Sequence, residues 1–434
     1  MTIEKKLEQL AEQAELSPAE IRGVRDCLTL HIERLDSLVF PAGFGFESFT
    51  LDEVVDYFLS ENHFNLSFKR QPGKGILYGL DHVAIRRNLF NSLPISLRRV
   101  VLLPKIKHFG IDQHMSGFLG MRSCVSINDA EDIGMGHSVF RVSTPHGQLV
   151  IKQESVPNQQ FYVELLRVLG YPWFKSRHFS GERSWEITDY LGDENLNDRL
   201  VNQKICDWNY LIDQLAQHAA IGDVLGREDR HFENYVTVND TILPVDTATL
   251  FGFGNEHWSE RYIAGGLYEI CILRQWIDNP DLMQHQLSRF KTGYMHQLSV
   301  LRDRQLEVRN LIAEFFQQPT VRSNEWRYVE SRLNDRNYEL VQFRRYRDGL
   351  VQMARRLDIR RWLESIPDKV LNMEPILKMY VLADRRRWST LFLFDRHESS
   401  VRSALRRHNL VVEERGVGQR FADTVNGLNW DLAN

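Results

Sequence analysis

The sequence contains few cysteines and no long apolar run. Its four cysteines, Cys27, Cys124, Cys206 and Cys271, lie far apart and form no Cys-x-x-Cys pair. This spacing excludes the common zinc and disulfide patterns and favours a reducing compartment. No stretch approaches the roughly 18 consecutive apolar residues that a membrane span requires, and the charged N-terminus lacks the apolar segment of a signal peptide. We therefore expect no membrane span and a cytoplasmic location, or secretion into a reducing host cytosol if the protein is an effector.

Several familiar catalytic patterns are also missing. The 15 histidines show no His-Glu-x-x-His spacing, and no Gly-x-Ser-x-Gly segment is present. These absences argue against a zinc hydrolase and against a serine hydrolase of the α/β type.

The charge is nearly balanced overall but unevenly distributed. The formal net charge is -4, which makes nucleic acid an unexpected partner. From residue 321 onward, however, basic residues outnumber acidic ones, and arginine pairs recur at 344–345, 355–356, 360–361 and 406–407. We expect either solvated helix faces or a surface for an anionic partner there.

The pattern of apolar residues predicts an α+β protein in three parts. Residues 1–125 are mainly helical, with helices expected at 3–16 and 17–38; residues 126–320 contain a strand-rich portion followed by helices; residues 321–434 form a basic helical region. Short β-type runs at 139–142 and 149–152, joined by a Pro-His-Gly turn, predict a hairpin. A helix at 159–169, a strand at 184–191 and a long helix at 207–225 follow.

The residues most relevant to chemistry follow the long helix. Strands expected at 234–238 and 242–245, joined by an Asn-Asp turn, would hold Asp229, Asn234 and Asp246 in one small volume. Carboxylate and amide oxygens are ligands that Mg²⁺ prefers. Phosphoryl transfer also needs a carboxylate that orients the acceptor hydroxyl. The set therefore suits phosphoryl transfer.

These residues also form a familiar motif. The series Asp229-Arg-His231-x-x-Asn234, followed by Val-Asp246-x-x-x-x-Phe-Gly252, resembles the catalytic and metal-binding loops of phosphatidylinositol 3/4-kinase-like enzymes and of HipA-type atypical kinases. The resemblance implies a bilobal protein-kinase-like fold with a small strand-rich N-lobe, a helical C-lobe and helical flanking regions. It implies that Asp229 is the catalytic residue, that His231 steadies the loop, and that Asn234 and Asp246 bind Mg²⁺ or Mn²⁺.

Upstream residues occur in the order that the resemblance requires. Gly134, Gly136 and Ser138 lie in a stretch similar to a Gly-rich phosphate loop before the hairpin. Lys152 resembles the ATP-binding lysine, and Glu164 falls on the helix where kinases keep its partner. Glu154 also lies near that lysine in the sequence, so the pairing stays open. By the same resemblance, Asp189 and Leu191 fall at the hinge between lobes and contact ATP.

The sequence departs from the kinase pattern after the metal-binding aspartate. Thr247-Ala248 replaces the usual Phe-Gly, and the segment Thr-Ala-Thr-Leu-Phe is also similar to the metal loop of class II lanthipeptide synthetases, which phosphorylate Ser or Thr and then eliminate the phosphate. We expect an ATP-dependent kinase that transfers the γ-phosphate to a hydroxyl of a protein or peptide. The alternatives are such a dehydratase, an inositol-lipid kinase, and a pseudokinase scaffold that binds nucleotide.

Overall fold

The computed structural model describes only part of the chain. The described residues are 5, 17–19, 21–23, 25–26, 91, 95, 98, 106, 109–122, 125–133, 139–154, 156–180, 184–202, 204–227, 230, 234–247, 250–251, 279–316, 324–364, 366–374, 398–410, 417–428 and 430. Most of the predicted N-terminal helices therefore lies outside the described residues. Of the residues that are described within them, all except Ser17 are helical.

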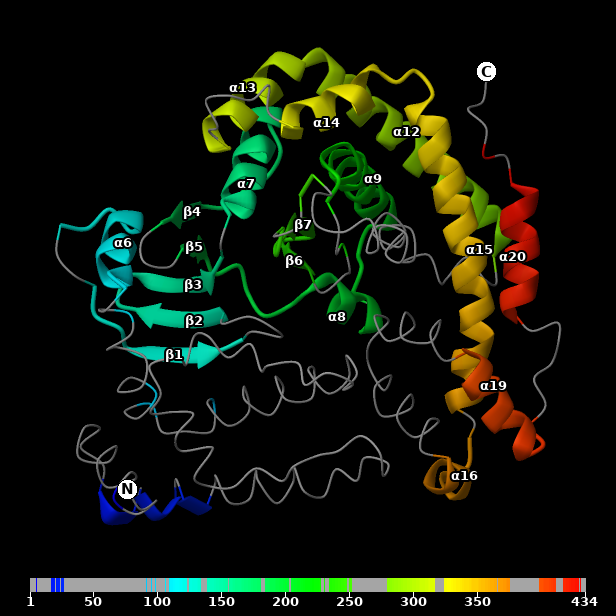
Figure 1. Cartoon of the computed structure of the whole chain (residues 1–434), viewed down its shortest axis with the longest axis horizontal. Helices are drawn as coiled ribbons and strands as arrows, with labels where there is room; N and C mark the ends of the chain where they lie inside the picture. The colour runs from blue at the N-terminus through cyan, green and yellow to red at the C-terminus, as the bar shows by residue number, and fades with distance from the viewer. Residues whose placement is uncertain are drawn as a thin grey trace. The chain divides into compact units, whose positions relative to one another are not determined.

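The mixed α and β composition predicted from the sequence is confirmed. Among the described residues, one sheet has five strands and a second has two (Figure 1). The strands are β1 (Asp129–Asp132), β2 (Val139–Thr144), β3 (Gly147–Gln153), β4 (Ser176–Phe179), β5 (Trp185–Asp189), β6 (Tyr235–Val238) and β7 (Thr241–Pro244). The helices include α6 (Ile111–Phe118), α7 (Asn158–Leu169), α8 (Leu196–Val201), α9 (Trp208–Leu225), α12 (Pro280–Asp303), α13 (Gln305–Phe315), α14 (Asn324–Asn334), α15 (Tyr338–Glu364), α16 (Asp368–Met373), α19 (Glu398–Arg407) and α20 (Val417–Gly427).

The chain divides into two compact units. The first comprises Met1–Gln160 and Phe174–Tyr190, and the second comprises Phe161–Trp173 and Leu191–Asn434. We call them the sheet unit and the helical unit. The chain changes unit three times, after Gln160, after Trp173 and after Tyr190, and the last change follows β5.

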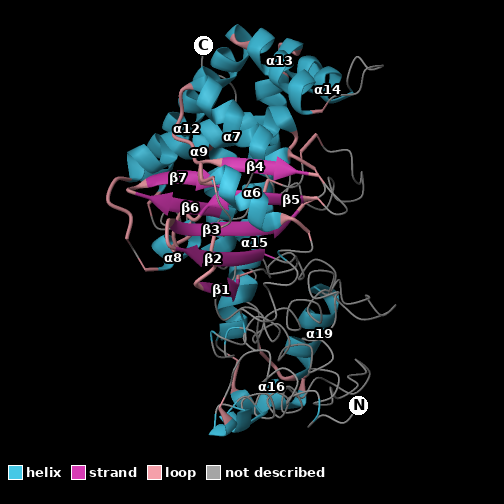
Figure 2. Cartoon of the chain, turned by 90° about the vertical axis from the view of Figure 1, so that its left-hand side faces the viewer, coloured by secondary structure: helices cyan, strands magenta, loops and turns pink. Residues whose placement is uncertain are grey.

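The sheet unit is built on the five-stranded antiparallel sheet, in the order β1-β2-β3-β5-β4. Helix α6 lies beside β5 (Figure 2). The alternation of the sequence sorts the side chains, because successive residues of a strand point to opposite faces. One face is apolar and buried, with Phe140 paired to Ile151 and Ile151 paired to Ile187. The next pairs along the same strands, Val139 with Lys152 and Lys152 with Glu186, lie on the opposite face.

The helical unit is organised around α9, whose residues are buried on nearly every side. Asp207 caps its first turn by accepting a hydrogen bond from the backbone N–H of Tyr210 (3.0 Å). Small residues let α12 lie close against α9 (Figure 1). A Cβ added to Gly293 of α12 would lie 3.0 Å from the Cβ of Ala216 of α9. The same core includes Trp326 of α14 and Tyr346 of α15, so it continues across the predicted boundary at residue 320.

Helices near the C-terminus are joined by apolar packing and by one ionic cluster. Helices α15 and α20 lie side by side (Figure 1). Glu374, directly after α16, accepts two hydrogen bonds from Arg407 of α19 (2.9 and 2.8 Å) and lies 3.0 Å from the ring of His408. In the part of the chain that is described, no helix combines the length and the hydropathy needed to cross a membrane.

Gly226 ends α9 and provides a test of the packing between the end of α9 and α14. It has a φ of 64°, a left-handed conformation, and a methyl group at its Cα would overlap the hydroxyl of Tyr328. Gly170 ends α7 with a φ of 79° but has open space around it. We expect Gly170→Ala to lower the free energy of unfolding by about 1–2 kcal/mol and Gly226→Ala to lower it by roughly 1–3 kcal/mol more. Chemical denaturation of the two variants would measure the difference; equal losses would contradict it.

Candidate functional site

Helix α9 holds the hairpin formed by β6 and β7 through two buried polar side chains. The amide of Gln214 donates to the carbonyl of Asp240 (3.0 Å) and accepts from the N–H of Ile242 (2.8 Å). One turn further along α9, the ring of His218 lies 3.2 Å from the carbonyl of Ile242. The helix therefore fixes the hairpin near its turn, at the start of β7.

Two of the predicted metal ligands, Asn234 and Asp246, lie at that open end. The N–H of Val245 donates to the carbonyl of Asn234 (2.8 Å), which extends the β6–β7 ladder by one pair. Asp246 is the next residue, so the structure brings the two together. Asn234 is only 6% exposed, whereas Asp246 is half-buried.

The segment that begins at Asp246 starts and ends in a strained conformation. Asp246 has a φ of 57° and Phe251 a φ of 64°, both in the left-handed region that side chains larger than glycine seldom occupy. The N–H of Phe251 donates to the carbonyl of Leu225 at the end of α9 (2.7 Å), and its ring packs against Phe161 and Phe316. Such strain persists only where the surroundings over-determine the backbone, and it is concentrated at functional sites.

Arg227 joins the two segments that carry these ligands. Its guanidinium donates to the hydroxyl of Tyr235 (3.2 Å) and to the carbonyl of Val245 (3.3 Å). These residues directly follow Asn234 and directly precede Asp246. Arg227 is 2% exposed, and its guanidinium also lies 5.0 Å from the centre of the Tyr235 ring. A buried arginine thus fixes the open end of the hairpin.

Arg230 is the arginine of the Asp-Arg-His motif, and it is anchored to α9. Its guanidinium donates to the carboxylate of Asp223 (2.7 Å) and to the carbonyl of Ala219 (3.3 Å). Both members of the ion pair are buried. Asp229 and His231, the predicted catalytic residues on either side of Arg230, lie outside the described residues.

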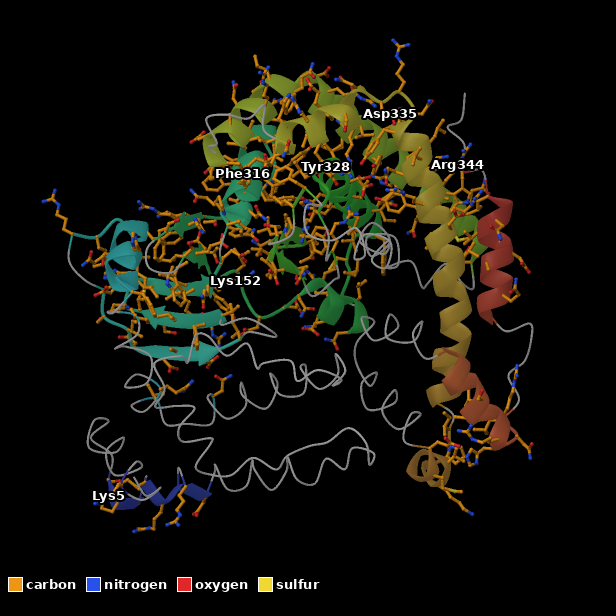
Figure 3. The ribbon with its side chains drawn as sticks, viewed as in Figure 1. Lys5, Lys152, Phe316, Tyr328, Asp335 and Arg344 are labelled. Carbon is orange, nitrogen blue, oxygen red and sulfur yellow. The ribbon has the colours of Figure 1, made fainter. Side chains whose placement is uncertain are left out.

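In the sheet unit, Lys152 lies on the polar face of the sheet (Figure 3). Its side chain is 12% exposed, and its ammonium group lies 3.0 Å from the carboxylate of Glu154. Glu186, its neighbour in register on β5, is buried and accepts a hydrogen bond from the hydroxyl of Ser176 (2.6 Å). Two carboxylates from the sheet unit itself therefore lie near the predicted ATP-binding lysine.

The other predicted ATP-binding residues have local roles where they are described. Glu164 of α7 belongs to the helical unit, and its carboxylate pairs with Arg167 (2.6 Å). Asp189 ends β5 and accepts a hydrogen bond from the backbone N–H of Lys175 (2.9 Å). Leu191 is the half-buried first residue after the change of unit. Gly134, Gly136 and Ser138 lie outside the described residues.

Within the described residues, no group of three or more His, Cys, Asp and Glu side chains is arranged to hold a metal. The predicted set differs in kind from such a group. It contains the amide of Asn234, and its third member, Asp229, lies outside the described residues. The two described members supply the oxygen donors that Mg²⁺ prefers.

The sequence reasoning did not identify the supporting residues Asp223, Arg227 and Glu186. One signal was available for Asp223. An acidic side chain in the last turn of a helix opposes the helix dipole, so an aspartate there needs a cationic or hydrogen-bonding partner. No comparable signal singled out Arg227, because its partners are separated from it by the intervening loop.

Comparison of the chain with protein-family models finds no match, and comparison with curated proteins finds none either.

His218 provides a test of the buried contact between α9 and the hairpin. Burial, and to a lesser extent the charge of Arg227, lowers the pKa of His218 from 6.5 to about 3. As the pH falls from about 6.5 toward 3, the unfolded chain takes up a proton at His218 and the folded chain does not. The free energy of unfolding should then fall by about 1.4 kcal/mol per pH unit from this group.

We expect His218→Gln to flatten that slope between pH values of about 6 and 4, since glutamine stays neutral and keeps an N–H for the carbonyl of Ile242. Denaturant titrations at several pH values would measure it. His146→Gln, which removes an exposed histidine, serves as the control. An unchanged slope in His218→Gln would show that other groups cause the acid sensitivity.

Proposed function

We propose that the protein is an ATP-dependent phosphotransferase, an atypical kinase with a bilobal protein-kinase-like fold. The observation that carries this proposal is the open end of the β6–β7 hairpin. It brings together Asn234 and Asp246, directly after the Asp-Arg-His motif, and it is fixed by Arg227. A hairpin used only as a surface feature would not need a buried arginine and a residue in the left-handed conformation, Asp246, at this end.

Asn234 and Asp246 are suited to hold Mg²⁺ or Mn²⁺. Both supply side-chain oxygens, and the loop that begins at Asp246 is anchored at its far end by the hydrogen bond from Phe251 to Leu225. When bound, such an ion would neutralise charge on the phosphates of ATP. The role of the chain is to fix the two ligands before the nucleotide arrives, so that little reorganisation is needed during transfer.

Asp229 would orient the acceptor hydroxyl and accept its proton, while His231 steadies the loop. In the transfer the acceptor oxygen forms a bond to the γ-phosphorus, the bond from that phosphorus to the β–γ bridging oxygen breaks, and ADP leaves. Arg230 is linked directly to Asp229 in the chain. Its anchorage to Asp223 supports this role, because catalysis depends on precise placement of the reacting groups.

In the sheet unit, Lys152 would contact the phosphates of ATP, with Gly134, Gly136 and Ser138 covering them. The carboxylate of Glu154 balances the charge of Lys152 and would hold its side chain in place. Kinases keep the partner of this lysine on the helix where Glu164 lies, whereas in this protein Lys152 pairs with Glu154.

The hinge between the lobes would lie at Asp189 and Leu191, where ATP would also be contacted. The last of the three changes of unit along the chain falls between Tyr190 and Leu191, which supports this assignment.

A protein or peptide hydroxyl is the acceptor that we propose. The residues after Gly252, Phe-Gly-Asn-Glu-His-Trp, carry no basic run that would attract a lipid phosphate. Arg344 and Arg345 of α15 are exposed and would provide a surface for an anionic partner.

The test is ATP turnover by Asp246→Asn, with Asp240→Asn as the matched control. Both aspartates lie in the same hairpin with a positive φ, 57° and 63°, which asparagine tolerates well. Asp240 lies at the turn and pairs with Arg199. With γ-labelled ATP and Mg²⁺ or Mn²⁺, alone and with candidate acceptors, we expect Asp246→Asn to lose turnover by on the order of 100-fold and Asp240→Asn to retain it.

The products distinguish the related activities. A gain of phosphate on a peptide or protein supports the proposal. A phosphorylated inositol lipid would show that the acceptor is a lipid and not a protein. Peptides that instead lose one water per site would indicate a dehydratase. ATP binding without turnover in the unmodified chain would contradict the proposal and identify a pseudokinase scaffold.

A further inference from the structure

The carboxylate of Asp223, at the end of α9, is the centre of a buried polar cluster. It accepts hydrogen bonds from the guanidinium of Arg230 (2.7 Å), the hydroxyl of Tyr294 (2.7 Å) and the hydroxyl of Tyr346 (2.6 Å). The two tyrosines come from α12 and α15, whereas Arg230 comes from the loop after α9. Three segments that are distant in the sequence therefore meet at one side chain.

The backbone at the same position is held separately. The carbonyl of Asp223 accepts hydrogen bonds from the hydroxyl of Tyr338 (2.9 Å) and from the guanidinium of Arg332. These contacts tie α14 and α15 to the end of α9 without using the carboxylate. The helical unit thus contains one set of bonds that fixes the helix end and a second set that fixes Arg230.

The cluster is costly to build, which argues that it does more than stabilise the fold. Removing two charges from water is unfavourable, and apolar side chains of similar size often stabilise a core as well or better. The chain also keeps a glycine within α9 to make room. A Cβ added to Gly222 would lie 2.7 Å from a nitrogen of Arg230. Glycine inside a helix is itself unfavourable.

We propose that Asp223 is a positioning residue for the catalytic loop, and that α12 and α15 act on that loop through Tyr294 and Tyr346. The inference rests on the proposed phosphotransferase function, because the residue joined to Arg230 is Asp229. Residues 321–434, to which α15 belongs, would in this way contribute to catalysis.

Tyr294 suits this role as a permanent hydrogen-bond donor. Tyr294 is buried, and its pKa is raised well above 10 by burial and then by the negative charge of Asp223. It therefore keeps its proton at any pH at which the protein is studied. The guanidinium and the two hydroxyls are the donors of all three bonds, and the carboxylate oxygens of Asp223 accept them.

The test compares Tyr346→Phe with Tyr338→Phe. Both changes remove one hydroxyl from a buried tyrosine of α15 that is bonded to Asp223, but only Tyr346 reaches the carboxylate. Replacing Asp223 itself would leave the Arg230 charge buried without its partner and risks unfolding the chain. The tyrosine variants retain both charges.

We expect Tyr346→Phe to lower kcat for phosphate transfer by about tenfold, with a KM for ATP within about twofold of the unmodified protein. Tyr338→Phe should change kcat by less than about twofold. A merely structural role would predict that both variants lower kcat alike, in proportion to their loss of stability, and that result would overturn the proposal.

A second measurement does not depend on activity. Hydrogen exchange at residues 227–234, followed by mass spectrometry, should be about tenfold faster in Tyr346→Phe than in Tyr338→Phe. Exchange in the middle of α9 should be the same in both variants. Equal exchange at 227–234 in both variants would refute the positioning role. Absence of turnover in the unmodified protein would refute the phosphotransferase function, and the exchange comparison would still decide whether Asp223 positions the loop.

Discussion

The buried ion pair between Asp223 and Arg230 is the interaction on which the proposed site depends. It connects the end of α9 to the loop that carries the Asp-Arg-His motif. Additional hydrogen bonds offset part of the cost of burying such a pair, and Tyr294 and Tyr346 both donate to the carboxylate oxygen of Asp223 that Arg230 does not use. The geometry of the loop is therefore tied to the packing of α12 and α15, which are far from it in the sequence.

The β6–β7 hairpin depends on the same helix in a second way. Gln214 and His218 fix the hairpin near its turn, and Arg227 fixes its open end. The strained backbone at Asp246 is held by these contacts and by the anchorage of Phe251. Rigid support on both sides of a strained, oxygen-bearing residue is the arrangement expected where ligands must be held ready before a substrate binds.

Much of the regular structure was predictable because local signals were strong. The two hairpins follow from alternating side chains and from turn residues at 145–147 and 239–240, and α9 follows from its apolar content, its Asp207 cap and its terminal Gly226. The strands β1 and β4 were missed. Both lie at edges of the sheet and are rich in polar residues, so their conformation is set by pairing with a neighbouring strand and not by intrinsic preference.

The sequence by itself determined the mixed α and β composition, the hairpins and the proximity of Asn234 and Asp246, since these depend on interactions between residues close in the chain. Only the tertiary structure decided that Arg227 joins the segments that contain Asn234 and Asp246, and that Asp223 gathers Arg230 with two distant tyrosines. Burial and long-range packing create these contacts, and neither can be read from residue spacing, because they depend on which helices meet after the chain has folded.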